Sequence, residues 1–245
     1  MGTGAGPAPV IIRSPAEANT KVFAAAMASG SFHYQSVSSG TSGGASGTET
    51  ESGDAGRGEG VQFMTSAFGD SEVIVVDSMA YMRGNATMLE NMFGYTLGEA
   101  APFVSRWIAF SPSDSLYRAV AADVTVDSLW GDPSLSPPDQ LPQNPESVSG
   151  LSTVSGSPSQ SVRYVLHGTN EAAKASYSGT ETIVFSTNDP HLPSLLTEHL
   201  STTSTQGAST DTTRVTFSHW GEPVTVSAPA ATIPFSALPA PTSTV

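Results

Sequence analysis

The residues whose types could perform catalysis are few and do not form a recognisable set. Residues 40–44 fit the G-x-S-x-G pattern, in which Ser42 would be a nucleophile. That pattern needs a sharp turn between a strand and a helix, which exposes the serine oxygen. Here the surrounding tract is rich in Gly and Ser, with no hydrophobic strand before it and no helical pattern after it. We therefore interpret the match as accidental.

Metal ligands and acid–base pairs are equally sparse. The five histidines are far apart in the chain: His33, His167, His191, His199 and His219. A zinc ion needs several ligands at about 2 Å, and His191 and His199 meet only if the segment between them folds back. The carboxylates are dispersed, and no calcium loop, phosphate loop, HExxH or dinucleotide motif occurs. The sequence predicts no catalytic residue, no metal and no cofactor.

The charge and the cysteine content of the chain exclude several classes of binding partner and site. The 245 residues include 22 acidic and 9 basic residues, for a formal net charge of −13. Such a charge repels phosphate backbones and anionic lipid, so we expect no nucleic-acid partner and no electrostatic membrane attachment. Cysteine is absent, which excludes disulfides and thiolate sites. No apolar run reaches the roughly 18 residues of a membrane-spanning helix.

The elements that must position any site begin with a helix. Ser14 as a cap, Pro15 at the first position and Gly30 as a stop predict a helix over residues 16–27. A strand over residues 31–37 follows. Residues 38–60 have almost no apolar side chain, so we expect a mobile loop there. Residues 1–13 lack the apolar centre of a signal peptide and are predicted to be a flexible tether.

Residues 71–110 carry the strongest pattern. Strands over 72–76 and 79–83, joined at Asp77-Ser78, lead into a short helix over residues 86–94 that Asn85 caps. Asn85 also begins a glycosylation sequence, but the cap is preferred because the following residues look helical. The block is rich in Met and aromatic residues. Such side chains either pack as an ordinary core or line a lipophilic cavity, since Met adapts to variable ligands.

The second half of the chain reads as a sheet. Short helices are predicted over residues 116–120 and 124–129, followed by a Pro-rich mobile loop over residues 132–147. Alternating apolar and polar residues then indicate half-buried antiparallel strands. They are expected at residues 147–153, 161–167, 181–186, 212–218 and 223–227, with a strand or a brief helix at 195–200. Because long βαβ units are absent, we do not expect a doubly wound nucleotide-binding fold. The expected fold class is α+β.

The order of these signals resembles the actinobacterial lipoproteins of the LppX/LprG type, which are related in fold to the bacterial lipoprotein carrier LolA. The motifs that carry the resemblance are the first helix, SFHY at 31–34, AYMRGN at 80–85, WI at 107–108, IVFST at 183–187 and VTFSHWGEPV at 215–224. The resemblance covers most of residues 14–235. The lipobox cysteine of the family is missing, and His191-Leu192-Pro193 replaces its usual Gly-Leu-Pro.

The resemblance implies a strongly curved antiparallel sheet, a half-barrel, with short helices across its concave face. It implies one domain over residues 14–235, followed by a flexible tail over 236–245. It also implies a cavity between sheet and helices that holds acyl chains of a lipid or lipoglycan. The apolar residues that we expect to line this cavity are Val75, Tyr81, Met88, Leu89, Met92, Phe93, Phe103, Trp107, Leu116 and Val120.

We therefore predict a non-catalytic, monomeric protein of the cell envelope that binds or carries a hydrophobic small molecule or lipid. Its location would be extracytoplasmic, with membrane attachment only through a lipid anchor encoded upstream of Met1. Two alternatives stay open. One is an envelope structural or protein-interaction domain with a filled core. The other is a hydrolase with a dispersed site, which substitutions at His167 and His219 would test.

Overall fold

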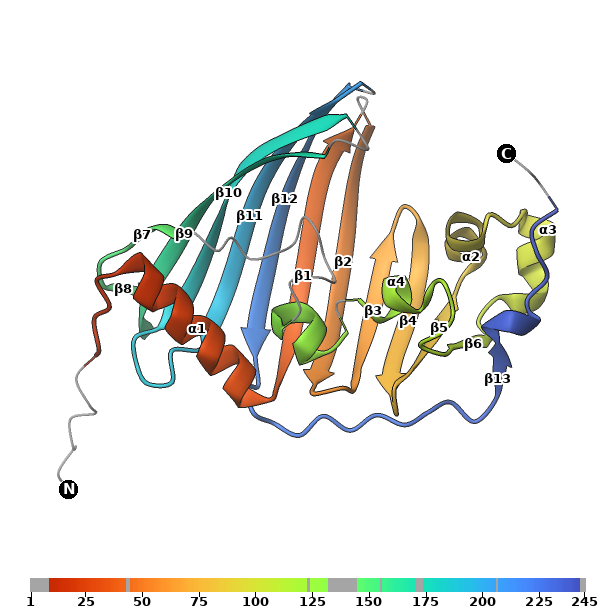
Figure 1. Ribbon diagram of the computed structural model, residues 1–245, viewed down its shortest axis with the longest axis horizontal. Coiled ribbons are helices and arrows are strands. Elements are labelled where there is room, and N and C mark those ends of the chain that lie inside the picture. Colours follow the sequence, from red (N-terminus) through yellow and green to blue (C-terminus); the bar gives the residue numbers. More distant parts are fainter. Residues whose placement is uncertain are drawn as a thin grey trace. The chain divides into compact units, whose positions relative to one another are not determined.

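The computed structural model describes residues 9–42, 45–122, 124–131, 145–154, 156–170, 174–205 and 207–242 (Figure 1). The chain divides into two compact units. The first unit contains residues 1–29, 39–46 and 140–217, and the second contains residues 30–38, 47–139 and 218–245. Strands β1 (Ser31–Ser42) and β2 (Ala45–Gly56) contribute residues to both units.

The second unit is an antiparallel sheet with short helices packed against it (Figure 1). Its strand order is β13-β6-β5-β4-β3-β2-β1. Strands β13 and β6 pair in parallel, whereas β6, β5, β4, β3 and β2 pair antiparallel in succession. The further strands are β3 (Gly60–Ser66), β4 (Gly69–Val76), β5 (Met79–Gly84), β6 (Trp107–Phe110) and β13 (Thr232–Pro234). The helices are α2 (Ala86–Phe93), α3 (Leu97–Ala100), η1 (Ala101–Phe103), α4 (Tyr117–Ala121), η2 (Asp127–Gly131) and η3 (Phe235–Ala237).

The core of the second unit follows from strand alternation. Val73 pairs with Met82 and Val75 with Ala80, so these four side chains share one face of β4 and β5. All four are buried, and Leu89 of α2 and Val120 of α4 pack in the same cluster. The face that the helices cover is therefore the apolar face of this sheet.

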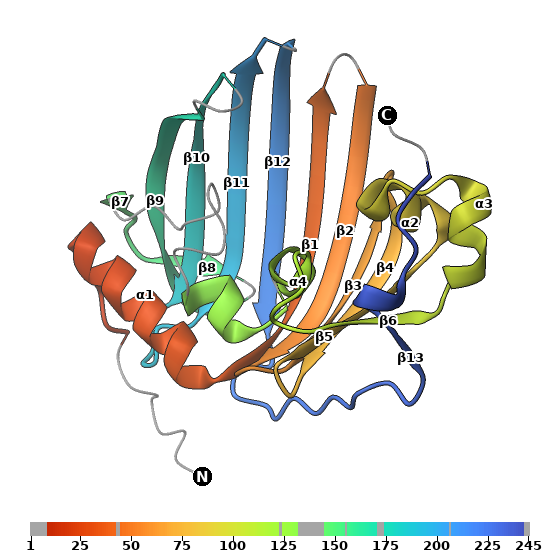
Figure 2. The ribbon, with the colours of Figure 1, turned by 45° about the vertical axis from the view of Figure 1, so that its right-hand side comes forward.

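The first unit packs one helix on an antiparallel sheet (Figure 2). The elements are α1 (Pro15–Ser29), β7 (Pro145–Val148), β8 (Ser152–Val154), β9 (Ser157–Asn170), β10 (Ala175–Ser186), β11 (Pro193–Ser204) and β12 (Gly207–Ser218). Ala18 and Val22 of α1 are buried in one cluster with Ile183 and other apolar residues of β9 and β10. The Tyr164 hydroxyl donates a 2.6 Å hydrogen bond to Asn19 Oδ1, which ties β9 to the helix.

The predicted α+β class is confirmed. The described strands form a curved and largely antiparallel sheet with a few short helices. The sheet is unclosed, because its strand order begins at β13 and ends at β7. The predicted helices and hairpin of residues 16–27, 72–94 and 116–120 form as expected. Residues 195–200 belong to strand β11, and residues 223–227 form no strand.

Three segments expected to be mobile are ordered instead. Residues 38–42 form the end of β1 and residues 45–56 form the whole of β2, because neighbouring strands satisfy their backbone groups. Thr50 to Ala55 pair with β3, for example. Ile12 is 2% exposed and its amide donates to Gln160 Oε1, so the tether ends before it. The tail up to residue 242 is held by side chains of the second unit, as described below. The expected Pro-rich loop lies mostly outside the described residues, apart from β7.

Candidate functional site

The candidate site lies in the second unit, where α2 and α4 pack on β4 and β5. The start of α2 is fixed by Asn85, whose Oδ1 accepts a 2.9 Å hydrogen bond from the Met88 amide. The Asn85 amide in turn donates to the Asp70 carbonyl at 3.0 Å. Gly94 ends the helix in the left-handed conformation. The predicted cap at Asn85 is confirmed.

Helix α2 approaches the sheet closely at a glycine. Gly69 has φ +115, and a Cβ there would lie 2.3 Å from the Met88 nitrogen. Only glycine tolerates both this backbone conformation and this distance. The contact sets how near α2 lies to β4, and with it the depth of the apolar layer between them.

Seven of the ten residues predicted to line a cavity lie in this layer. Val75, Leu89 and Val120 are at most 4% exposed and form its base. Met88 is also buried, but it packs over Gly84, where a Cβ would lie 2.9 Å from its Cγ, and it is not a member of the core cluster. Met92, Phe93, Phe103 and Leu116 are half-buried and pack against the buried cluster. The layer thus has a closed base and a partly exposed rim that contains a methionine and two phenylalanines.

Tyr81 and Trp107 lie on the opposite face of the sheet. Strand alternation places Tyr81 away from Ala80 and Met82, which are buried in the core cluster. Trp107 lies under the guanidinium of Arg83, 4.8 Å from the ring centre to Cζ. The prediction that all ten residues share one lining is corrected for these two residues. A lining role for the other eight stays a prediction.

The sequence did not indicate that the C-terminal segment belongs to this layer. The Phe235 ring lies 5.1 Å from that of Phe110 and 6.2 Å from that of Phe93, so η3 adds an aromatic residue to the cluster. Leu238 packs there too. The only signal was a pair of apolar residues, Ile233 and Phe235, within a Pro- and Ala-rich tail.

Hydrogen bonds hold that C-terminal segment at the edge of the layer. Tyr95 donates a 2.7 Å hydrogen bond to the Pro239 carbonyl, and burial together with the nearby Glu99 carboxylate raises the pKa of its phenol. Glu99 accepts hydrogen bonds from Thr242 and from Thr96, which lower its pKa from 4.5 to about 2. The predicted flexible tail is therefore anchored as far as residue 242.

Most of the groups considered for catalysis lie apart from one another in the described part of the chain. Within the described ranges, no three His, Asp or Glu side chains are grouped so as to hold a metal ion. Ser42 lies in strand β1, whereas a nucleophile of that motif needs a turn. His191 is buried beside Phe185, and His199 bonds Thr212. His33 and His219 do come together, with ring centres 5.8 Å apart, and His33 also pairs with Asp54.

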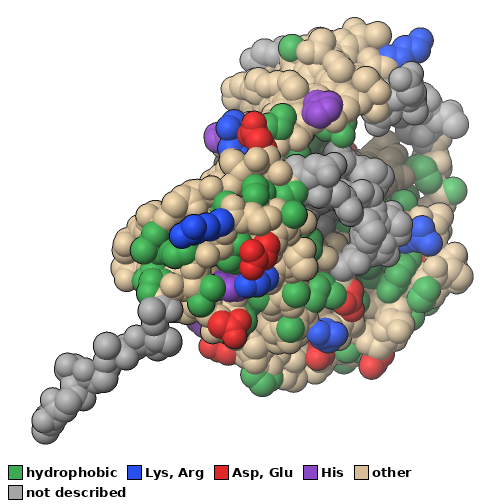
Figure 3. All heavy atoms as spheres, turned by 60° about the vertical axis from the view of Figure 1, so that its left-hand side comes forward, with side chains coloured by type: hydrophobic (Ala, Val, Ile, Leu, Met, Phe, Trp, Pro, Cys, Tyr) green, Lys and Arg blue, Asp and Glu red, His purple; other side chains and the backbone are tan. Residues whose placement is uncertain are grey.

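The surface agrees with the low content of basic residues. On the face shown in Figure 3, Lys and Arg side chains are scattered singly, and uncharged side chains and backbone form most of the surface. None of the helices in the described part of the chain has the length and hydrophobicity that a membrane crossing needs.

Comparison with known proteins identifies similar folds. No protein-family model and no curated protein sequence matches the chain. The crystal structure of the Mycobacterium tuberculosis lipoprotein LppX matches with a TM-score of 0.36 and 10% identity, over 87% of this chain and 98% of that chain. The chain resembles LppX in fold.

Two other solved structures are similar. A LolA superfamily protein from Nitrosomonas europaea matches with a TM-score of 0.31 and 10% identity, over 85% of this chain and 92% of that one. A DUF1329 family protein from Desulfovibrio piger has a TM-score of 0.28 and 10% identity, over 87% and 95% of the two chains. LppX and LolA are the proteins that the sequence resemblance names, and the likeness to all three structures concerns the fold alone.

Proposed function

We propose that the protein binds a hydrophobic ligand, such as the acyl chain of a lipid, at the helix-covered face of the second unit. The observation that carries the proposal is the half-buried rim of Met92, Phe93, Phe103 and Leu116 on a fully buried apolar base. An apolar rim that is left partly exposed to water gains free energy when a ligand covers it. The role proposed for these side chains is contact and desolvation, without bond-making chemistry.

The energetics suit an acyl chain. Burying a methylene group contributes about 0.8 kcal/mol, so about ten methylenes would supply on the order of 8 kcal/mol before ordering costs. Methionine suits such a site because its flexible thioether adapts to different chain positions. The neighbouring Phe93 and Phe103 provide rigid surfaces, and their contacts with Phe235 and Tyr95 hold them in place.

A pair of methionine variants tests the proposal. Met92 and Met79 are both half-buried in the second unit, but Met92 packs against the core cluster and Met79 shares the opposite face of β5 with Tyr81. We expect Met92→Gln to weaken the binding of a fluorescent long-chain fatty acid about fivefold, because about 1 kcal/mol of apolar contact is lost. Titration by fluorescence measures the two dissociation constants.

The Met79→Gln variant is the control, and its affinity should equal that of the natural protein. An equal loss in both variants would place the ligand elsewhere. No uptake of the fatty acid by the natural protein, together with a bare-chain mass in native mass spectrometry, would favour the alternative of a filled core. The stacked Phe93, Phe110 and Phe235 rings are the feature that speaks for that alternative.

The proposal includes a location outside the cytoplasm, which the sequence resemblance to envelope lipoproteins implies. Fractionation of the natural host tests this location. Recovery of the protein from the cytoplasmic fraction alone would contradict it.

A further inference from the structure

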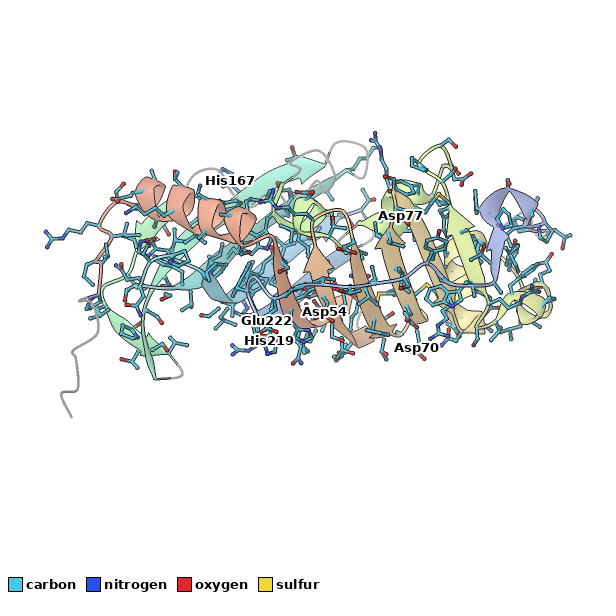
Figure 4. All side chains as sticks on the ribbon, turned by 90° about the horizontal axis from the view of Figure 1, so that it is seen from below. Asp54, Asp70, Asp77, His167, His219 and Glu222 are labelled. Atoms are coloured by element: carbon cyan, nitrogen blue, oxygen red, sulfur yellow. The ribbon has the colours of Figure 1, made fainter. Side chains whose placement is uncertain are left out.

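A pocket lies in the same unit, on the face of its sheet opposite the apolar layer. Residues 219–231 connect β12 to β13 as a strap that runs past the ends of the strands (Figure 4). The pocket lies between the strap and the strands β1, β2 and β3 and has a volume of about 340 Å³. Its strap side is residues 219 and 222–226, and its sheet side includes His33, Asp54 and Val61.

The register of the strands places this pocket opposite the apolar layer. Asp54 pairs with Val61, and Val61 pairs with Ile74. Directly paired residues share a face, so all three lie away from Val73, which is buried in the core cluster. The pocket is therefore separate from the site proposed for acyl chains.

The strap is firmly attached where the pocket begins. The Gly221 amide donates to the Ser31 carbonyl at 2.9 Å, and the Ser31 hydroxyl donates to the Glu222 carbonyl at 2.5 Å. The Trp220 ring lies 4.7 Å from the Phe32 ring. Farther along, Val224 lies so close to β2 that a Cβ on Gly56 would be 3.2 Å from its own. The pocket thus has ordered walls on both sides.

The polar part of the pocket lining is acidic. Asp54, Glu222, His33 and His219 line it, and none of its described lining residues is Lys or Arg. Figure 4 shows Asp54, His219 and Glu222 gathered at the strap, away from Asp70 and Asp77. His33 Nδ1 lies 2.9 Å from Asp54 Oδ1. With an ionised carboxylate and a neutral imidazole, the shared proton is on Nδ1, which leaves Nε2 as an acceptor.

Most of the remaining lining is apolar. It includes Val61, Pro223, Val224 and Val226, and Val61, Val224 and Val226 are half-buried. Acidic and aliphatic groups lie side by side in this lining, since Asp54 and Val61 are paired. A pocket of this size and composition complements a small organic cation with an aliphatic part. An ammonium group carries three donors and no acceptor, which matches carboxylate oxygens and an imidazole acceptor.

We propose that this pocket binds a primary alkylamine, with its ammonium group at Asp54, Glu222 and His33 and its alkyl chain against Val61, Val224 and Val226. The amine is either a free small molecule or the lysine side chain of a protein. Both present the same chemistry to the pocket.

Titration of the isotope-labelled protein with ethylamine and n-butylamine, followed by amide NMR, tests the proposal. We expect shifts at residues 33, 54, 61 and 219–226. Affinity should rise about two- to fourfold for each added methylene, since the full burial of one corresponds to about fourfold. The variant Asp54→Asn/Glu222→Gln should bind n-butylamine at least about fivefold more weakly, because the charge-assisted contacts are lost.

Asp77→Asn is the matched control, since it removes one carboxylate from the same unit at a turn with φ 52, which Asn tolerates. It should bind n-butylamine like the natural protein. Nα-acetyl-lysine methylamide, titrated in parallel, separates the sources: binding supports a lysine side chain, and binding of alkylamines only supports a free amine. Three results would overturn the proposal. They are amide shifts that lie outside the pocket, no amide shifts at tens of millimolar amine, or an equal loss of affinity in the Asp77→Asn control.

Discussion

The side chains of Glu99 and Thr242 decide how the C-terminal segment is held. Hydrogen bonds from Thr242 and Thr96 lower the pKa of Glu99 from 4.5 to about 2. A carboxyl group with a lowered pKa stabilises the folded state above its unfolded pKa, and this contribution is lost as pH falls through the folded pKa. Between pH 4.5 and about 2, protonation should therefore weaken the attachment of the segment.

We predict that Glu99→Gln makes the melting temperature less dependent on pH in this window. The natural protein should lose more stability than the variant between these limits, because only it has this carboxylate to protonate. Thermal unfolding at a series of pH values measures the difference. Glu90→Gln is the control, since it leaves the bonds between Glu99 and Thr242 in place, and it should follow the natural protein. Parallel curves for the natural protein and Glu99→Gln would contradict this account.

At the scale of elements, α2 is the helix that forms the site. Its position depends on Gly69, where φ is +115 and a Cβ would lie 2.3 Å from the Met88 nitrogen. Gly69→Ala should lower the free energy of unfolding by about 3 kcal/mol or more, because it adds backbone strain and pushes α2 from the sheet. Urea unfolding measures the change. Gly98→Ala, which has nothing within 4 Å of the added Cβ, should be neutral or slightly stabilising.

The elements also show what sequence patterns can reveal. Local signals predicted α2 well, since Asn85, the apolar positions and Gly94 are close together in the chain. Residues 45–56 were predicted as a loop because they are polar, yet they form β2, which pairs with β3. Polar residues reveal no such pairing locally, because it depends on how the strands of the whole sheet are arranged. Phe235 joins the cluster across more than a hundred residues of chain. Alternation along β5 does separate the faces, and applying it to Tyr81 would have removed that residue from the lining.

At the scale of the whole molecule, charge should affect which ligands bind. The formal net charge of −13 disfavours anionic head groups near the surface at low ionic strength. We predict that a neutral monoacylglycerol binds more tightly than the fatty acid carboxylate of the same chain length, on the order of threefold at low salt. The difference should shrink as salt screens the field. Competition titrations at two salt concentrations measure it, and a preference for the carboxylate at low salt would be inconsistent with this expectation.

The central claim is that a hydrophobic ligand binds under α2 and α4 in the second unit. The most direct measurement is photo-crosslinking with a diazirine-bearing long-chain fatty acid, followed by peptide mapping by mass spectrometry. The account predicts that label concentrates on residues 86–103 and 116–121, is displaced by unlabelled fatty acid, and falls in Met92→Gln but not in Met79→Gln. Saturable label at the opposite face of β5, or no saturable label on the chain, would contradict the account.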